Sequence, residues 1–387
     1  MANTSSPSPI LLPRRGALRR IAAGGLALTA ARGWAQSAGR LVLGQSAAFT
    51  GPAAQLGIQM NQGARLCFDA FNAAGGLGGL RIDLQTLDDG YEPARCKANT
   101  EKFLSADVFA LFGYVGTPTS LAALPLVREG RTPFFGAFTG AMALREPFAR
   151  QVFHVRASYE DETALIVKQL TSLGLNRVAV FRQNDSYGQA GLDGVTKALK
   201  ANGLTPVAVA TVERNSVDVA AAVKALVPLQ PDAIVQISAY KSCAAFIREA
   251  RRAGYGGTFY NVSFVGTQAL ADELGREANG VVVSQVMPYP YTSSVPIVRE
   301  YKAAIKAAAD PKVKPNYSSM EGYIAARVFI EGLKRARSPT FDAFLGAMES
   351  VQGFDLGGFT VNFGPHTHVA SHFVELSMLT DDGGVRR

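Results

Sequence analysis

The chain has 387 residues, of which 48% are hydrophobic and 18% are charged, so it is long and apolar enough to bury two sizeable cores. Its formal charge is +8, but five arginines lie in the first 35 residues, which contain no acid, and the remainder carries only +3. A weak charge concentrated at one end argues against a nucleic-acid-binding protein, and we expect no nucleic-acid partner.

The first 35 residues have the pattern of an export signal. A basic segment at 14–20 precedes an apolar run at 21–31, and Gly33-Trp34-Ala35 places small residues where a signal peptidase acts. We therefore expect cleavage after Ala35 and a mature protein in the periplasm. Arg14-Arg15 indicates the Tat route, but Ala17 replaces the bulky apolar residue usual in that signal, so Sec export stays open.

Strand-like and helix-like patterns alternate along the rest of the chain, which is typical of parallel α/β domains. The pattern restarts near Tyr159, and the proline-rich segment Met287–Tyr291 indicates a crossing between domains. The fold class is therefore α/β, with two α/β units joined by several crossings. The family resemblance described below implies that these units are Rossmann-like lobes around a central ligand cleft. We assign residues 36–156 plus 288–353 to lobe 1 and residues 157–287 plus 354–387 to lobe 2.

Two strand ends in the first half of the chain predict a binding site. The apolar run 108–112 is typical of a buried parallel strand, and a glycine-containing turn and a helix start at Thr117-Pro118 follow it. A second short strand at 133–135 is followed by the small residues of 136–140. Ligands of open α/β sheets bind at the carboxyl ends of strands, and hydroxyls and amides at a helix start favour an anion. These two loops are therefore predicted to hold a carboxylate.

Two residues are expected to cap helices. Thr117 stands at an N-cap position before Pro118, and this role is compatible with ligand contact because the helix start faces the cleft. Asp185 is expected to cap the helix that starts near Tyr187 rather than to touch the ligand.

The three cysteines leave their redox state open. Cys67 and Cys96 lie on the first two predicted helices of one lobe, so an exported protein could form a disulfide between them. The alternative of two buried free thiols is equally consistent with the sequence. Cys243 has no obvious partner, and no pair of cysteines has the spacing of zinc ligands.

The sequence offers no constellation for catalysis, a cofactor or a metal. No serine or cysteine lies in a nucleophile elbow, so we do not expect an enzyme. His366, His368 and His372 cluster, but acidic ligands are missing nearby, and we expect a solvent-exposed hairpin there instead of a metal site.

Several short motifs occur in one order along the chain. They are 46–52 (SAAFTGP), 61–64 (NQGA), 72–76 (NAAGG), 88–89 (DD) and 184–188 (NDSYG). Each motif is weak alone, but together they make nearly the whole mature chain resemble the type I periplasmic binding proteins, the leucine/isoleucine/valine-binding type of ABC transporter component. The resemblance implies a monomeric solute-binding protein whose two lobes close around a ligand, about a three-strand hinge, and deliver it to a permease. A sensor with the same fold is the alternative.

The resemblance also implies roles for single residues. Family members hold the ligand carboxylate with groups that fall here on Thr117, Ala137 and Thr139. Tyr187 matches a tyrosine that lines the cleft, and Tyr240 matches the tyrosine that faces the ammonium group of amino-acid ligands, within one residue. The family's glutamate for that ammonium falls on Ser263.

The serine at position 263 favours a ligand without an amine. Burying an ammonium group without a carboxylate partner costs several kcal/mol of binding free energy. We therefore expect a small carboxylate such as an aromatic acid or a 2-oxo acid, with an amino-acid ligand as the alternative. Aromatic residues at or next to the cleft loops could stack on it: Phe49, Tyr114, Phe138, Tyr187, Tyr240 and Phe264. For Phe138 and Phe264, simple core packing is equally consistent with the sequence.

Overall fold

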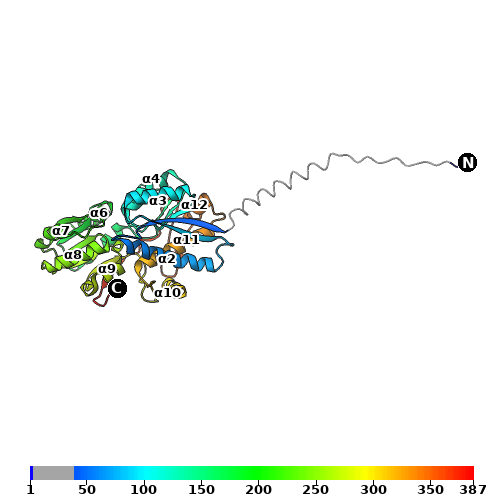
Figure 1. The fold of residues 1–387 in the computed structure, drawn as a ribbon. Helices are drawn as coiled ribbons and strands as arrows, with labels where there is room; N and C mark the ends of the chain where they lie inside the picture. Colours follow the sequence, from blue (N-terminus) through cyan, green and yellow to red (C-terminus); the bar gives the residue numbers. More distant parts are fainter. Residues whose placement is uncertain (3–38) are drawn as a thin grey trace.

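The computed structural model describes residues 1–2 and 39–387, which fold into two α/β lobes lying side by side (Figure 1). The predicted export signal and its cleavage site lie outside the described residues. Within the described part, none of the helices has both the length and the apolar character needed to cross a membrane.

The sheet of the first lobe has five parallel strands in the order β2-β1-β3-β4-β5. The strands are β1 (Arg40–Ala47), β2 (Arg81–Asp88), β3 (Ala110–Phe112), β4 (Phe134–Phe135) and β5 (Val152–Phe153). The short strands β3, β4 and β5 are apolar because they are buried on both faces, as the sequence predicted for the run at 108–112, whereas the edge strand β2 alternates and is partly exposed.

Helices cover both faces of this sheet. Helix α2 (Ala54–Ala73) packs against α11 (Tyr317–Arg335) on one face, and α3 (Pro93–Ser105) packs against α4 (Thr117–Glu129) on the other. Two further helices join the α2 face: α10 (Pro296–Ala308) and α12 (Phe341–Glu349). The α2 and α11 faces meet closely because Gly63 and Gly322 lack a side chain where the two helices touch.

Side-chain alternation along the short central strands builds two separate cores. Phe112, Phe135 and Phe153 point toward the α2 face and stack in a row, with ring centroids 6.0 Å apart at each step. Their neighbours Leu111 and Phe134 point toward α3 and α4. The sheet therefore separates two apolar layers, as the period-two pattern of a strand requires.

This separation decides the state of the cysteines. Cys67 on α2 belongs to one apolar layer and Cys96 on α3 to the other, so the sheet lies between them and both thiols are free. The predicted disulfide is wrong, and the alternative of two buried free thiols is confirmed. Cys243 is also buried and free, and burial raises the pKa of all three thiols.

The second lobe contains a seven-stranded sheet in the order β14-β13-β10-β9-β8-β6-β7. Its parallel strands are β6 (Val178–Gln183), β7 (Ala208–Val212), β8 (Ala233–Ile237), β9 (Thr258–Asn261) and β10 (Val282–Gln285). The antiparallel strands β13 (Glu375–Leu379) and β14 (Val385–Arg386) complete one edge. Five helices accompany the sheet: α5 (Tyr159–Ser172), α6 (Ser186–Lys200), α7 (Ala220–Leu226), α8 (Tyr240–Arg252) and α9 (Thr267–Leu274).

The chain crosses between the lobes three times. The first crossing joins β5 to α5, the second joins β10 to α10, and the third leads into β13. The hairpin of β11 (Phe354–Asp355) and β12 (Thr360–Val361) precedes the third crossing, and Val369 still pairs with His154 beside the first sheet. Residues 354–369 therefore lie with the first lobe, whereas the sequence assignment placed them in the second.

Candidate functional site

Two threonines meet where β3 and β4 end. Thr117 is the first residue of α4 and Thr139 lies just after β4; both are fully buried, and their hydroxyl oxygens are 2.6 Å apart. We call them the hydroxyl pair. The prediction that Thr117 is the N-cap of α4 is wrong, because Gly116 takes that position with a φ of 101°. A side chain at Gly116 would also collide with the Tyr91 ring, so glycine is required there.

The hydroxyl pair can donate one hydrogen bond outward. Thr139 Oγ1 also accepts from the Ala141 N–H at 3.3 Å. One of the two hydroxyl protons is used between the threonines, and the other is left for an external acceptor. Ala137, predicted to contribute its backbone, is buried beside them at the end of the same strand. The pair thus has the chemistry expected for holding an anion at a helix start.

Aromatic rings from both lobes meet next to the hydroxyl pair. The Phe264 ring of the second lobe lies 5.5 Å from Phe138 and 5.9 Å from Tyr91 of the first lobe, and 4.6 Å from Tyr187. All four side chains are fully or almost fully buried. Phe138 and Phe264 therefore form contacts between the lobes, not only within one core.

Two tyrosine hydroxyls at this interface, those of Tyr187 and Tyr159, have no hydrogen-bond partner among the described residues. Tyr187 OH is buried with no hydrogen-bond partner among the described residues, and burial raises its pKa. Tyr159 lies 5.4 Å from it, ring to ring, and its hydroxyl approaches Thr139 without a hydrogen bond of normal geometry. A buried hydroxyl without a partner costs about 1–3 kcal/mol, so a ligand that satisfies these groups would be stabilised.

Other predicted aromatic residues lie elsewhere. Tyr114 points into the α3 layer, where its hydroxyl lies 3.1 Å from Thr100 Oγ1, so its predicted place in the cleft is wrong because strand alternation turns it away. Phe49 is half-buried in the loop after β1, where its N–H donates to Asp88. Tyr240 begins α8 and lies beside the Gln55 backbone of the opposite lobe.

Ser263 lies in a buried cluster of charges beside the first crossing, which we call the hinge cluster: Arg156, Glu162, Ser263 and Glu321. Arg156 and Glu162 are wholly buried, and Arg156 Nη2 donates to Glu162 Oε1 at 3.0 Å and also to Ser263 Oγ. The Glu162 carboxylate accepts further hydrogen bonds from Ser263 N at 2.7 Å and Ser263 Oγ at 3.0 Å. Ser284 Oγ adds another at 2.6 Å. An acid therefore does approach position 263, but its oxygens are fully occupied.

Glu321 of α11 completes the hinge cluster from the first lobe. Its carboxylate oxygen lies 3.5 Å from Arg156 Nη1, and it makes no hydrogen bond to any described residue. It borders a cavity of about 10 Å³ together with Ser263, Phe138 and Tyr317. Burial raises the pKa of Glu321 to about 7; Arg156 and Arg145 oppose this shift, and Glu162 adds to it.

Polar contacts at the rim hold the lobes together. Arg214 of the second lobe donates to Glu92 of the first at 2.9 Å, and Asn215 Nδ2 donates to Gly90 O at 3.1 Å. Gln183 Nε2 donates to Tyr91 OH at 3.3 Å. The interface cavity beside the hinge cluster has room for about one water molecule. The lobes are therefore closed on each other.

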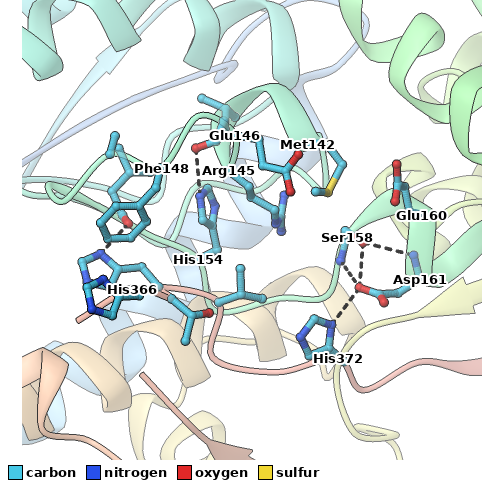
Figure 2. Close-up of a pocket in the computed structure, with 16 residues that line it drawn as sticks. Met142, Arg145, Glu146, Phe148, His154, Ser158, Glu160, Asp161, His366 and His372 are labelled. Atoms are coloured by element: carbon cyan, nitrogen blue, oxygen red, sulfur yellow. Dashed lines mark hydrogen bonds and ion pairs between the residues drawn. The ribbon is translucent and has the colours of Figure 1, made fainter. Parts of the chain in front are cut away.

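A larger cavity of about 420 Å³ lies on the other side of the crossings (Figure 2). None of the predicted ligand-binding residues lines it. Some of its polar groups are paired: His154 Nε2 lies 3.2 Å from Leu144 O, and Asp161 accepts from Ser158 and contacts His372 at 3.2 Å. Others have no hydrogen-bond partner among the described residues, namely Arg145 Nε, His154 Nδ1 and His368 Nε2. We assign no ligand to it.

The histidine cluster next to this cavity is only partly exposed. His366 and His372 are exposed, but His368 is buried and stacks on Phe153 with ring centroids 3.9 Å apart, so the predicted exposed hairpin is wrong there. No group of three or more metal-ligating side chains occurs in residues 1–2 and 39–387.

The three charged members of the hinge cluster were not predicted from the sequence. A signal was present for two of them. Arg156 ends the otherwise apolar strand segment around Phe153, and Glu321 is a lone acid within an apolar stretch of α11. Charged residues in such positions are rarely buried unless they are paired.

Comparison with known proteins agrees with this architecture. Residues 41–384 match the family model described as periplasmic binding protein. The Leu/Ile/Val-binding protein homolog 8 of Brucella abortus (strain 2308) is 24% identical over 337 residues, covering 81% of this chain and 82% of that protein.

Solved structures share the fold. A possible leucine/isoleucine/valine-binding protein from Rhodopirellula baltica SH 1 is 36% identical with a TM-score of 0.87, covering 90% of this chain and 96% of that one. A fatty acid ABC transporter substrate-binding protein from Thermomonospora curvata is 20% identical with a TM-score of 0.80, covering 90% of each chain, which shows the fold alone. The chain therefore belongs to the periplasmic binding protein family, in its type I, leucine/isoleucine/valine-binding branch.

Proposed function

We propose that this protein is the solute-binding component of an ABC importer, without enzymatic activity, and that it captures a small carboxylate between its closing lobes. The favoured ligand has an aromatic or branched apolar body and no amine, such as an aromatic acid or a 2-oxo acid. The observation that carries the proposal is the contrast between the hydroxyl pair, which has a hydrogen bond to donate, and Glu162, the acid that is hydrogen-bonded to Ser263, which has none left to accept.

The hydroxyl pair supports an anion on the first lobe. Thr117 and Thr139 lie at the carboxyl ends of adjacent parallel strands, next to the start of α4. The unpaired amides of a helix start and a free hydroxyl proton favour a negative charge. Phe138, Phe264 and Tyr187 surround this position with apolar rings and one free hydroxyl, which suits an aromatic or apolar ligand body.

The hinge cluster supports a ligand without an ammonium group. Glu162 is paired with Arg156 and accepts three more hydrogen bonds from Ser263 and Ser284. An ammonium group would have to displace Arg156, which would leave a buried guanidinium without a partner and cost about 3–5 kcal/mol.

Thermal-shift measurements on the mature protein test the proposal. The screen contains benzoate and phenylacetate, a set of 2-oxo acids, and leucine, isoleucine and valine. Ligand binding raises the melting temperature by mass action, so we expect a shift from members of the first two groups. Stabilisation by the branched-chain amino acids with none from the oxo acids would instead support the alternative. In that case the protein binds amino acids, as the names of its relatives suggest.

A further inference from the structure

A tyrosine at the start of α5 has a hydroxyl that no described residue uses. Tyr159 follows Ser158, the N-cap of α5, and only 1% of its surface is exposed. Its hydroxyl has no hydrogen-bond partner among the described residues. Burying a polar group in this way is costly, because the group loses its contact with water and gains nothing in return. A bound ligand would supply the missing partner.

The backbone holds Tyr159 in one place. Tyr159 N donates to Gly140 O at 2.8 Å, and Thr163 Oγ1 donates to Tyr159 O at 2.7 Å. A side chain at Gly140 would lie 2.6 Å from Tyr159 N and 2.7 Å from the ring, so glycine lets the ring pack directly on the loop after β4. Ser158 and Asp161 form a capping box that fixes the start of α5. The position of the hydroxyl is therefore set by the protein and needs no ligand.

The Tyr159 hydroxyl lies beside the proposed carboxylate site. It approaches Thr139 of the hydroxyl pair without a hydrogen bond of normal geometry. The Arg156 guanidinium carbon lies 5.8 Å from the centre of the Tyr159 ring. This positive charge stabilises negative charge on the phenol oxygen, so it makes the hydroxyl a stronger donor. A donor with an unused proton is thus placed next to the group that would hold the ligand carboxylate.

We infer that Tyr159 donates a hydrogen bond to an oxygen on the carbon next to the ligand carboxylate, and so selects 2-oxo acids over acids without that oxygen. The inference rests on the proposed function, because it takes the hydroxyl pair as the carboxylate site. It narrows the ligand from small carboxylates in general to one class. The oxo and carboxylate groups of such an acid are on adjoining carbons, so their oxygens need donors that lie side by side. The hydroxyl pair and Tyr159 meet this need.

The selectivity comes from what each acid offers to the Tyr159 hydroxyl. A carbonyl oxygen only accepts hydrogen bonds, which suits a hydroxyl with a free proton. An acid with only hydrogen atoms on this carbon leaves the hydroxyl buried without a partner, and its binding is weaker for that reason. A phenol oxygen can also accept a hydrogen bond, so Tyr159 alone does not exclude an amine. That exclusion comes from the occupied oxygens of Glu162.

The test compares acids that differ only in the oxo group. The pairs are 4-methyl-2-oxopentanoate with 4-methylpentanoate, and phenylpyruvate with 3-phenylpropanoate. Isothermal titration calorimetry measures each Kd for the mature protein and for Tyr159→Phe, which removes the hydroxyl and keeps the ring. Tyr255→Phe is the matched control. Tyr255 is also buried in the second lobe, but it lies before the amino end of β9 and its hydroxyl already donates to Thr258 O at 3.4 Å.

We expect the wild type to bind the oxo acid of at least one pair about tenfold more tightly than the acid without the oxo group. The ratio should fall to about one in Tyr159→Phe, through weaker binding of the oxo acid, and stay about tenfold in Tyr255→Phe. Equal binding of both acids by the wild type overturns the inference and leaves the proposed function standing. A preference that survives in Tyr159→Phe, or that is lost only in Tyr187→Phe, also overturns it. Binding of none of the four acids overturns it too, and the ligand screen then decides on the proposed function.

A second measurement needs no ligand. Because the Tyr159 hydroxyl has no partner in the described protein, Tyr159→Phe loses no hydrogen bond. It should therefore unfold at the wild-type melting temperature or above it, whereas Tyr255→Phe should unfold below it. Thermal unfolding without ligand measures both variants. A lower melting temperature for Tyr159→Phe than for Tyr255→Phe would show that the protein already uses this hydroxyl, and would overturn the inference.

Discussion

The hydroxyl pair and the hinge cluster are both buried at the interface between the lobes, but they are built from opposite chemistry. Thr117 and Thr139 are neutral, hydrogen-bond mainly to each other, and retain one proton for an external acceptor. Arg156 and Glu162 form a buried ion pair, and Glu321 lies 3.5 Å from Arg156 Nη1. The comparison shows that a buried acid near a cleft is not by itself a site for an ammonium group. What matters is how many of its hydrogen bonds are still available.

The largest expected effect comes from removing the cation of the hinge cluster. Arg156→Ala leaves Glu162 and Glu321 buried without their shared partner, so we expect the free energy of unfolding to fall by about 3–5 kcal/mol. Urea unfolding at neutral pH measures this change. Arg40→Ala, which breaks an exposed pair with Asp83, is the matched control and should cost less than about 1 kcal/mol. Equal losses in the two variants would mean that the hinge cluster is no more important than a surface ion pair.

A second prediction concerns how Glu321 makes stability depend on pH. Because its pKa is raised to about 7, its contribution to stability is greatest below the ordinary value of 4.5 and is lost as the pH rises through 7. Glu321→Gln should therefore gain stability relative to the wild type with rising pH, by up to about 3 kcal/mol at pH 8. Urea unfolding at pH 5, 6, 7 and 8 gives the two curves, and parallel curves would contradict the account.

The hydroxyl pair can be tested through affinity. Thr117→Ala and Thr139→Ala should each weaken binding of the acid that gives the largest thermal shift by about 1.5–3 kcal/mol, because one variant removes the hydroxyl that donates to the charged group and the other removes the hydroxyl that orients it. Isothermal titration calorimetry measures the loss. Thr211→Ala, on the exposed edge strand β7, is the control and should bind normally. Unchanged affinity in both cleft variants would move the anion site away from these loops.

The smallest effect is expected from the thiols, which lie outside both regions. Since Cys67 and Cys96 are on opposite sides of the sheet, dithiothreitol should leave the melting temperature of the mature protein unchanged. Ellman's reagent should react with the three cysteines only after unfolding. A fall of several degrees with reductant would show a disulfide and a different packing of α2 and α3.

The sequence predicted the fold well because its signals are local. Buried strands, helix starts and the order of the motifs place the elements. Asp185 caps α6 as expected, through hydrogen bonds from Tyr187 N and Gly188 N. The hydroxyl pair was also predictable, because adjacent parallel strands bring their carboxyl ends together without further information.

The hinge cluster could not be predicted in the same way, because its members come together only in three dimensions. Arg156 and Glu162 are near each other in the chain, but Ser263 and Glu321 are more than a hundred residues away from them. The family resemblance shows that the glutamate is absent at position 263. It does not show that Glu162 approaches this position from α5. The prediction for Tyr114 was wrong for a related reason. The register of a short strand decides which face of the sheet each of its residues points to.

The most direct test of the proposed ligand class compares two molecules that differ only at the carbon next to the carboxylate. Leucine and 4-methyl-2-oxopentanoate have the same apolar side chain and the same carboxylate, but only leucine carries an ammonium group. Isothermal titration calorimetry on the mature protein should show the oxo acid binding at least about tenfold more tightly, because the carboxylate of Glu162 has no hydrogen bond left for an ammonium group. Tighter binding of leucine would contradict the account.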